Sequence, residues 1–304
     1  MPAFEIVASA ENNHYMEWQA MLFHYSCQKT QRQTPIIAVH KGDEPLLPGF
    51  EMISANGGHV QPVPNLRNHR GVLYPPRNTA VALQAVDTAA DYIILCDADM
   101  VFLQPLPLKS VQIDSDTISF DRVGYLHPDH PVYQPDIDNV FRSSGIDPTR
   151  LRNPVIDGGV PHVVPKQLQK SLAKEWRRCI DVFPILFEGE RPDSSDERYN
   201  DWPMRCYLAS MWAIIMAKHR LNLNHVETRW SMNNYNDDQP MPDPGSEIFL
   251  LHYCYGSPAF DKRHLADDND VRCIAFRNLA PDDGTVAGFL RKILREAAQF
   301  YGLC

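Results

Sequence analysis

The feature that most constrains the fold is a continuous apolar run that ends in two aspartates. Residues 92–95 are apolar, and Asp97 and Asp99 follow them in the segment DYIILCDADMVFL at 91–103. A run of this kind is typical of a central parallel strand that is buried on both faces. Ligands of open α/β sheets bind outside the carboxyl ends of such strands. The run therefore predicts an α/β fold with a polar site where this strand leaves the sheet.

Helical and strand patterns alternate on both sides of this segment. Before it we expect strands at 4–8 and 35–39, a weaker strand at 51–54, and helices over 15–25 and 78–90. After it we expect a strand at 117–120, a long loop to 153, helices over 168–183 and from 201 to about 218, a strand at 249–253, and a terminal helix over 286–300. We interpret residues 1–110 as a nucleotide-binding half and residues 111–304 as a mixed α/β half of one continuous domain.

Charge and hydropathy exclude several classes of function. The chain has 29 basic and 38 acidic residues, a net charge of −9, and no run of five or more basic residues, so we expect neither nucleic acid nor an anionic membrane as a partner. No apolar run reaches the ~18 residues of a membrane span, and the first residues lack the pattern of a signal peptide. We therefore expect a cytoplasmic protein, with a trimmed secretory-pathway protein as the alternative.

A pair of aspartates separated by one residue is a weak signal by itself, because this chain contains four such pairs. Only Asp97 and Asp99 follow a continuous apolar strand, and the strand period of two places both carboxylates on one side. The small Ala98 between them leaves room for a ligand against the backbone. Two hard oxygen ligands suit Mg²⁺ or Mn²⁺ together with substrate phosphates, and a solvated acidic loop is the alternative.

A second polar segment follows the late apolar strand. His252 ends that strand and is a candidate third ligand of the same metal. Gly256 allows close approach of a phosphate, and Lys262 and Arg263 are candidates for contacts with its oxygens. A histidine that is satisfied within the core is the alternative for His252.

These two segments together resemble the GT-A glycosyltransferases. More narrowly, YMEWQ at 15–19, the strand that runs on into FLQPLP at 102–107, and HYCYG at 252–256 with FDKR at 260–263 look like the hydroxyproline O-arabinosyltransferase and peptidyl-serine α-galactosyltransferase group. These pieces span nearly the whole chain. The resemblance implies a GT-A fold, a nucleoside-diphosphate sugar as donor, expected to be UDP-linked, and transfer of a hexose or pentose to a hydroxyl acceptor with retention at the anomeric carbon.

The resemblance also implies that residues 1–110 bind the nucleotide-sugar and residues 111–304 the acceptor, and it implies roles for individual residues. Asp97, Asp99 and His252 would hold Mn²⁺ or Mg²⁺, and Lys262 would lie near the diphosphate. Contacts with the nucleotide, its ribose or its phosphates are expected at the end of the first strand and at the start of the second helix, from Ala8, Ala10, Glu11, Arg77 and Asn78.

The chain departs from the group's pattern in one place. Where an acidic residue is expected, after the start of the helix that follows Trp202, the chain has Ser210. An acidic side chain is therefore missing at a position near the acceptor. The acceptor stays open among a peptide hydroxyl, a glycan and a small molecule.

The catalytic side chains depend on the stereochemical outcome. Retention requires no strong base from the protein, because the diphosphate itself can take the acceptor proton. Inversion requires a carboxylate within hydrogen-bond reach of the acceptor hydroxyl, and the candidates are Asp157 and Asp201. The alternatives are a turn carboxylate beside glycines for Asp157 and a helix N-cap for Asp201.

Three other functions compete with glycosyl transfer. A haloacid-dehalogenase-type phosphatase would use Asp97 as nucleophile and Asp99 as acid/base, but its motif normally opens the chain. A sugar-1-phosphate nucleotidyltransferase would need a Gly-rich phosphate loop after the first strand, which is absent here. A nucleotide-sugar or carbohydrate-binding protein that has lost transfer is the non-enzymatic alternative, motivated by Ser210.

Overall fold

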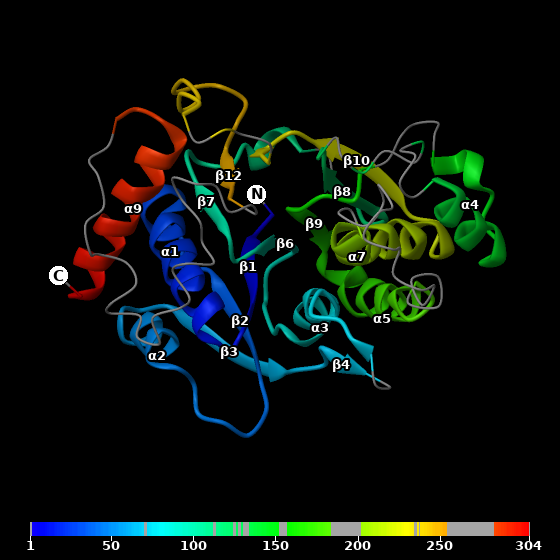
Figure 1. Cartoon of the computed structure of the whole chain (residues 1–304), viewed down its shortest axis with the longest axis horizontal. Coiled ribbons are helices and arrows are strands. Elements are labelled where there is room, and N and C mark those ends of the chain that lie inside the picture. The colour runs from blue at the N-terminus through cyan, green and yellow to red at the C-terminus, as the bar shows by residue number, and fades with distance from the viewer. Residues whose placement is uncertain are drawn as a thin grey trace. The chain divides into compact units, whose positions relative to one another are not determined.

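The computed structural model describes residues 2–69, 72–111, 114–123, 126, 129, 134–151, 157–183, 202–233, 236, 238–253 and 283–303 (Figure 1). The chain forms two compact units, each built from three segments. Unit 1 comprises Met1–Ala3, Leu66–Ile93 and Gln112–Thr228, and unit 2 comprises Phe4–Asn65, Ile94–Val111 and Arg229–Cys304. The predicted division into residues 1–110 and 111–304 stays a prediction. The donor and acceptor roles assigned to the two halves stay predictions.

The largest sheet has the strand order β3-β2-β1-β6-β9. Its strands are β1 (Phe4–Glu11), β2 (Ile36–Lys41), β3 (His59–Pro64), β6 (Tyr92–Asp97) and β9 (His162–Pro165). The pairs β1–β2 and β2–β3 are parallel, and the division between the units passes through β6, after Ile93. The predicted α/β fold is confirmed, and so are the strands expected at 4–8, 35–39 and 92–95. Strand β3 was not predicted.

Two helices accompany the first strands of unit 2. Asn13 caps the start of helix α1 (His14–Gln31), and its side chain accepts a hydrogen bond from the Met16 amide at 2.9 Å. Helix α2 (Pro48–Ala55) lies where the sequence predicted a weak strand at 51–54, so that prediction is wrong. Pro48 occupies the first turn, where it fits a helix, and the buried residues Phe50 and Ile53 are three apart, which is a helical period.

The predicted segment 91–103 forms two strands. Strand β6 ends at Asp97, and β7 (Met100–Phe102) begins after the Ala98-Asp99 turn. Strand β7 pairs antiparallel with β12 (Leu250–His252), and β12 pairs parallel with β11 (Ser231–Met232). The late strand expected at 249–253 is thereby confirmed. This small sheet, β11-β12-β7, links the aspartate segment to the histidine segment.

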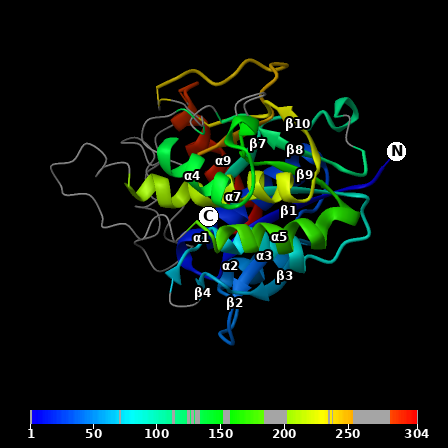
Figure 2. The same ribbon diagram turned by 90° about the vertical axis from the view of Figure 1, so that its right-hand side faces the viewer.

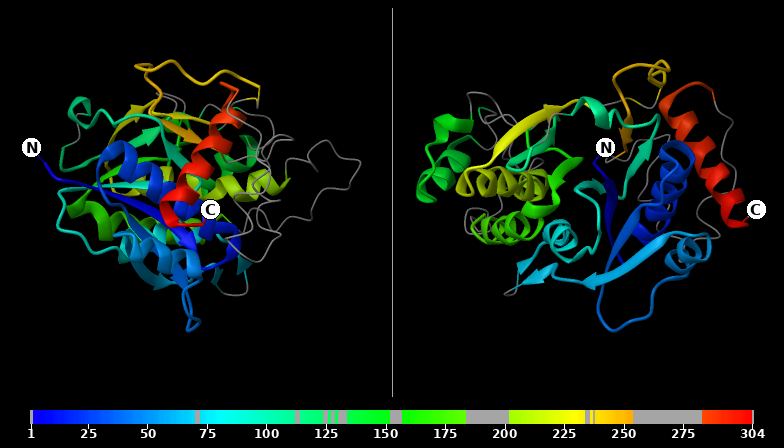
Figure 3. Two further views of the ribbon diagram at one scale, coloured as in Figure 1. Left: turned by 90° about the vertical axis from the view of Figure 1, so that its left-hand side faces the viewer. Right: turned by 180° about the vertical axis from the view of Figure 1, so that it is seen from behind.

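The terminal helix predicted over 286–300 is confirmed as α9 (Val286–Tyr301). Its apolar stripe is buried, and Thr285 caps its start by accepting a hydrogen bond from the Gly288 amide at 3.1 Å. Figure 3 shows α9 beside α1. The Tyr301 hydroxyl lies 2.5 Å from His24 Nδ1 of α1, and burial lowers the pKa of His24 from 6.5 to about 4.

Unit 1 contains a group of packed helices and a second small sheet. Helix α5 (Gln169–Ile180) packs on α3 (Arg77–Ala85) and on α7 (Trp202–Arg220), which lies beside it in Figure 2. Strand β8 (Thr117–Asp121) pairs parallel with β10 (Asn224–Thr228), and β4 (Asn68–His69) pairs antiparallel with β5 (Val72–Leu73). The helices expected over 168–183 and 201–218 and the strand at 117–120 are confirmed, and the helix expected over 78–90 is confirmed but ends at Ala85. Single 3-10 turns form at Leu108–Ser110, Pro148–Leu151 and Lys166–Leu168.

The long loop expected before residue 153 is corrected in part. Helix α4 (Gln134–Ser143) lies within it, and its residues Ile137, Val140 and Phe141 are buried. Their spacing of three and four places them on one helical face, a signal that the surrounding prolines and polar residues obscure. None of the described helices combines the length and the apolar character that a membrane crossing requires.

Candidate metal and nucleotide site

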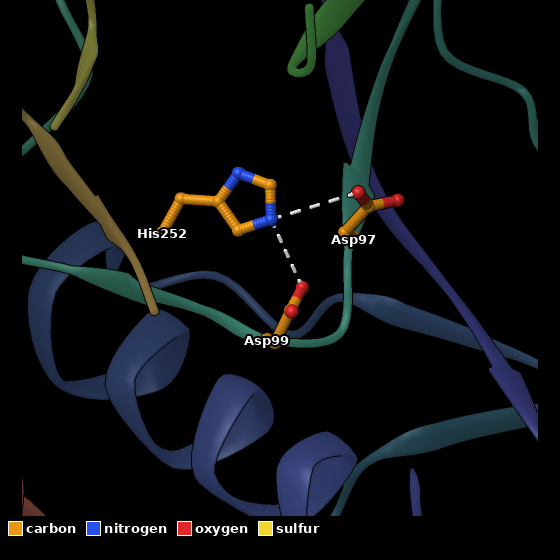
Figure 4. Close-up of side chains that lie close together, drawn as sticks. All are labelled: Asp97, Asp99 and His252. Atoms are coloured by element: carbon orange, nitrogen blue, oxygen red, sulfur yellow. Dashed lines mark hydrogen bonds and ion pairs between the residues drawn. The ribbon is translucent and has the colours of Figure 1, made fainter. Parts of the chain in front are cut away.

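Three predicted ligands converge on one point in unit 2. His252 Nε2 lies 3.1 Å from Asp99 Oδ1 and 3.7 Å from Asp97 Oδ2, and one ligand atom from each residue lies within 4.8 Å of the others (Figure 4). Asp97 comes from the end of β6, Asp99 from the turn that follows, and His252 from the end of β12. The structure thus brings together the three side chains that the sequence singled out.

Strand pairing explains how residues so distant in sequence meet. The turn at Ala98 and Asp99 leads the chain into β7, and β12 runs antiparallel to β7 with His252 opposite Met100. The Tyr253 amide donates to the Asp99 carbonyl oxygen at 3.1 Å, which extends this pairing into the turn. The backbone, rather than the side chains alone, therefore holds the histidine against the aspartates.

A fourth residue, Asn233, fixes the orientation of the imidazole. Its Oδ1 lies 2.8 Å from His252 Nδ1, while its Nδ2 donates to Ser231 Oγ at 3.0 Å. An amide oxygen can only accept, so Nδ1 carries a proton, and Nε2 is the nitrogen that faces the carboxylates. Metal-binding histidines are usually oriented in this way. The sequence analysis missed Asn233, because no motif marks it and its place depends on the pairing of β11 with β12.

The three side chains of the group differ in their exposure to solvent. The side chain of Asp97 is 38% exposed, that of Asp99 15% and that of His252 7%. A ligand would therefore reach the group from the side of Asp97. Two carboxylate oxygens and one imidazole nitrogen form a set that suits Mn²⁺ or Mg²⁺, with further positions left for substrate oxygens. The residues present fit a divalent metal ion.

The other donor-site residues predicted in unit 2 are more deeply buried. Ala8, Ala10 and Ala98 are 0% exposed, so the surrounding protein covers them in this structure. Glu11 ends β1, is 7% exposed, and accepts a hydrogen bond from Asn13 Nδ2 at 3.2 Å. Contacts of these four residues with a nucleotide stay predictions.

Two donor-site residues predicted in unit 1 lie at the start of α3. Arg77 is buried and forms an ion pair with Asp181, the residue that ends α5. Asn78 is also buried, and its Oδ1 accepts a hydrogen bond from the Leu66 amide at 2.9 Å. Their roles toward the donor stay predictions.

The catalytic candidate Asp157 is 4% exposed. Its Oδ2 lies 3.8 Å from Arg122 Nε, which belongs to the same unit. The next residue, Gly158, packs so closely on α7 that a Cβ there would lie 2.5 Å from the Met211 carbonyl oxygen. The glycine is thus required by packing, and a catalytic role of Asp157 stays a prediction. The remaining predicted site residues lie outside the described residues: Asp201, Gly256, Lys262 and Arg263.

Ser210, where an acidic residue was expected, lies in the interior of unit 1 at 6% exposure. Its amide donates to the Tyr74 hydroxyl at 2.7 Å, and its carbonyl oxygen accepts from Trp176 Nε1 at 2.8 Å. Its Oγ lies 3.5 Å from the Pro76 carbonyl oxygen. Neighbouring residues enclose this position, and the small serine side chain fits into the space they leave.

Comparisons with known proteins identify the fold. No family model and no curated protein matches the sequence. Among solved structures, the galactosyltransferase LgtC in complex with donor and acceptor sugar analogs matches 99% of this chain and 100% of its own, with 12% identity and a TM-score of 0.52. An active-site mutant of LgtC matches 96% and 95%, with 12% identity and a TM-score of 0.50.

The glycosyltransferase GlyE of Streptococcus pneumoniae TIGR4 matches 99% of this chain and 62% of its own, with 10% identity and a TM-score of 0.47. At these identities the two LgtC structures establish the fold alone. The predicted GT-A-like fold is confirmed: the chain is a mixed α/β protein with a central, mostly parallel sheet, and its fold matches that of LgtC. The narrower arabinosyl- and galactosyltransferase group is not established by them.

Proposed function

We propose that this chain is a metal-dependent glycosyltransferase that moves a sugar from a nucleoside-diphosphate sugar, UDP-linked by preference, to a hydroxyl acceptor. The observation that carries the proposal is the convergence of Asp97, Asp99 and His252 within 4.8 Å. The GT-A-like fold supports the proposal. Fold alone does not determine function, but a metal-ligand group within a fold of this kind raises the expectation of glycosyl transfer.

Each residue of the group has a distinct part in this proposal. Asp97 and Asp99 would bind Mn²⁺ or Mg²⁺ through oxygen, and His252 would bind it through Nε2. When bound, such an ion offsets the negative charge that develops on the departing nucleoside diphosphate. Asn233 accepts the Nδ1 proton and holds the ring in the binding orientation. Gly256, Lys262 and Arg263 are proposed to contact the diphosphate.

The stereochemical outcome that we propose is retention. It rests on the resemblance to the arabinosyl- and galactosyltransferase group and requires no strong base from the chain. If the sugar is inverted instead, Asp157 or Asp201 is the proposed base. The acceptor is a peptide hydroxyl, a glycan or a small molecule.

Two alternatives are less well supported. A haloacid-dehalogenase-type phosphatase is not favoured, because the fold resembles glycosyltransferases and His252 Nε2 lies next to both aspartates that such an enzyme would use as nucleophile and acid/base. A binding protein that has lost transfer would keep the metal group, and only a reaction measurement separates it from an enzyme.

The test is mass spectrometry of the purified chain incubated with UDP-sugars, with and without candidate acceptors, in MnCl₂ or EDTA. We expect transfer, or slow release of free sugar, that requires the metal and is lost in Asp99→Ala. The control is Asp116→Ala, which removes an exposed aspartate from a different Asp-x-Asp pair. Donor binding without transfer or hydrolysis would identify a binding protein, and activity that persists in EDTA and in Asp99→Ala would contradict the proposal.

A further inference from the structure

Helix α1 of unit 2 supports the chain that carries the candidate metal ligands. We call Asp97, Asp99 and His252 the metal-ligand group. Helix α1 packs on β7, beside which it lies in Figure 1. Ser26 Oγ accepts a hydrogen bond from the Phe102 amide at 3.3 Å, and Thr30 Oγ1 donates to the Phe102 carbonyl oxygen at 3.2 Å. Since Phe102 lies three residues after Asp99, α1 holds the strand into which the aspartate turn leads.

Trp18 occupies the same face of α1, near the start of the helix. It lies eight residues before Ser26, a spacing that places both side chains on one helical face. Its ring stacks on that of Tyr253, with the centroids 6.0 Å apart and the planes at 29°. Trp18 is 2% exposed and Tyr253 is 0% exposed, so the contact is buried. Aromatic pairs at this separation attract one another beyond the effect of the area that they bury.

Tyr253 connects two members of the metal-ligand group. It follows His252 directly in the chain, and its amide donates to the Asp99 carbonyl oxygen at 3.1 Å. A displacement of Tyr253 would therefore move His252 through the chain and Asp99 through the hydrogen bond. Asn233 sets the rotation of the imidazole ring, whereas the position of the His252 backbone depends on its neighbours in the strand and on Tyr253.

The position of these two ligands matters because one ion must contact all three side chains at once. A binding group of this kind works when its atoms are held within about 0.5 Å of the required positions. The Asp97 side chain is 38% exposed, whereas those of Asp99 and His252 are 15% and 7% exposed. The two buried ligands are thus the ones that the protein interior can hold in place, and Trp18 contacts the residue that joins them.

We propose that Trp18 is a positioning residue, whose ring holds Tyr253 so that the ligand atoms of His252 and Asp99 keep the spacing that one divalent metal ion requires. This inference rests on the proposed function, which assigns a metal ion to the group. It places part of the metal affinity in a helix to which the proposal assigns no metal ligand. If Trp18 served only the core, its loss would lower stability and leave the metal affinity of the folded chain unchanged.

The experiment is titration of the whole chain and its variants with MnCl₂, with and without UDP, followed by electron paramagnetic resonance of the free ion. We expect Trp18→Leu to raise the Kd of Mn²⁺ about fivefold. This is less than the loss of about 10-fold to 100-fold that is typical of residues in direct contact with metal ligands, because Trp18 acts through Tyr253. Trp18→Phe keeps an aromatic ring and should hold the Kd within about twofold of that of the unaltered chain.

A double-mutant cycle tests whether the two rings act as one contact. Tyr253→Leu should raise the Kd of Mn²⁺ about as much as Trp18→Leu. The double variant should raise it no further than the larger of the two single effects, because either substitution already removes the stack. Should Trp18→Leu not fold, Tyr253→Leu takes its place in the comparison with the control.

The matched control is Phe50→Leu. Phe50 is 0% exposed and belongs to α2, which packs on α1 and on β3. The substitution removes a buried ring from the same unit and should lower the melting temperature without changing the Kd of Mn²⁺. Each Kd is measured at a temperature at which circular dichroism shows the variant to be folded.

Three results would overturn the inference. An unchanged Kd in Trp18→Leu, while Asp99→Ala abolishes Mn²⁺ binding, removes the role of Trp18 and leaves the proposed function standing. An equal rise of the Kd in Phe50→Leu means that general loss of stability, and not the stack, weakens the metal-ligand group. Absence of Mn²⁺ binding by the unaltered chain, with UDP and without it, overturns the proposed function and this inference together.

Discussion

The metal-ligand group of unit 2 and the Arg77–Asp181 pair of unit 1 combine charged side chains in different ways. The first gathers two carboxylates and an imidazole nitrogen, which are ligands for a cation. The second joins a buried guanidinium to a carboxylate of opposite charge, at the start of α3 and the end of α5. The first arrangement therefore favours binding of a metal ion, whereas the second favours the packing of two helices.

The largest expected effect is on the metal-ligand group. His252→Ala removes the one nitrogen ligand and should lower the transfer rate on the order of 100-fold or more, because charge on the leaving group is then less well stabilised. The measurement is the initial rate at saturating donor, together with Mn²⁺ affinity by electron paramagnetic resonance. A rate within a few-fold of the unaltered chain would mean that His252 is not a ligand.

A smaller effect is expected from the residue that orients His252. Asn233→Leu removes the acceptor for Nδ1 and should weaken Mn²⁺ binding about 10-fold, in the range found for residues that support metal ligands. Ser231→Ala, which only removes the contact to Asn233 Nδ2, should have less effect. Equal effects of the two substitutions would argue against a specific hydrogen bond to the imidazole.

The contact that Gln169 of α5 makes with the end of α3 should matter for stability alone. Gln169 is 1% exposed and donates to two carbonyl oxygens at the end of α3. Gln169→Ala should therefore lower the free energy of unfolding by about 1–3 kcal/mol, measured by urea denaturation. The Kd of UDP should not change. A raised Kd with unchanged stability would contradict a purely structural role of Gln169.

The smallest effect concerns a histidine that serves packing instead of binding. His162 is buried between the rings of Phe120 and Trp176, and burial lowers its pKa from 6.5 to about 4. Between these pH values the unfolded chain binds a proton that the folded chain does not, so stability falls as the pH is lowered from 6.5 toward 4.

His162→Phe should remove one such proton from the pH dependence. The slope of unfolding free energy against pH should then decrease by up to about 1.4 kcal/mol per pH unit. Urea denaturation at several pH values between 4 and 6.5 measures it. An unchanged slope would show that His162 is already protonated in the folded chain.

Much of the fold could be predicted from the sequence, because strands buried on both faces and amphipathic helices leave strong local patterns. The apolar run before Asp97 predicted β6, and the stripe over 286–300 predicted α9. The pattern failed for α2, where Glu51, Met52 and Ile53 are too few residues to separate a strand period from a helical one. Helix α4 was missed because its apolar residues lie among prolines and aspartates.

The residues of the candidate site also differ in how well the sequence could predict them. Asp97 and Asp99 were predictable because a strand and two carboxylates are adjacent in the sequence, and His252 because it ends a strand of its own. Asn233 was not predictable. It acts only through His252, which strand pairing brings near, and no local pattern reports such a pairing.

The central claim is that Asp97, Asp99 and His252 bind a metal that in turn binds a nucleoside diphosphate. Isothermal titration of UDP, GDP and their sugars in MnCl₂ or EDTA, on the unaltered chain and on Asp99→Ala, tests it most directly. The account predicts that a nucleoside diphosphate, expected to be UDP, binds only with the metal, that Asp99→Ala abolishes this binding, and that Asp116→Ala retains it. Failure of every nucleotide to bind in any metal condition, or binding that survives both EDTA and Asp99→Ala, would contradict it.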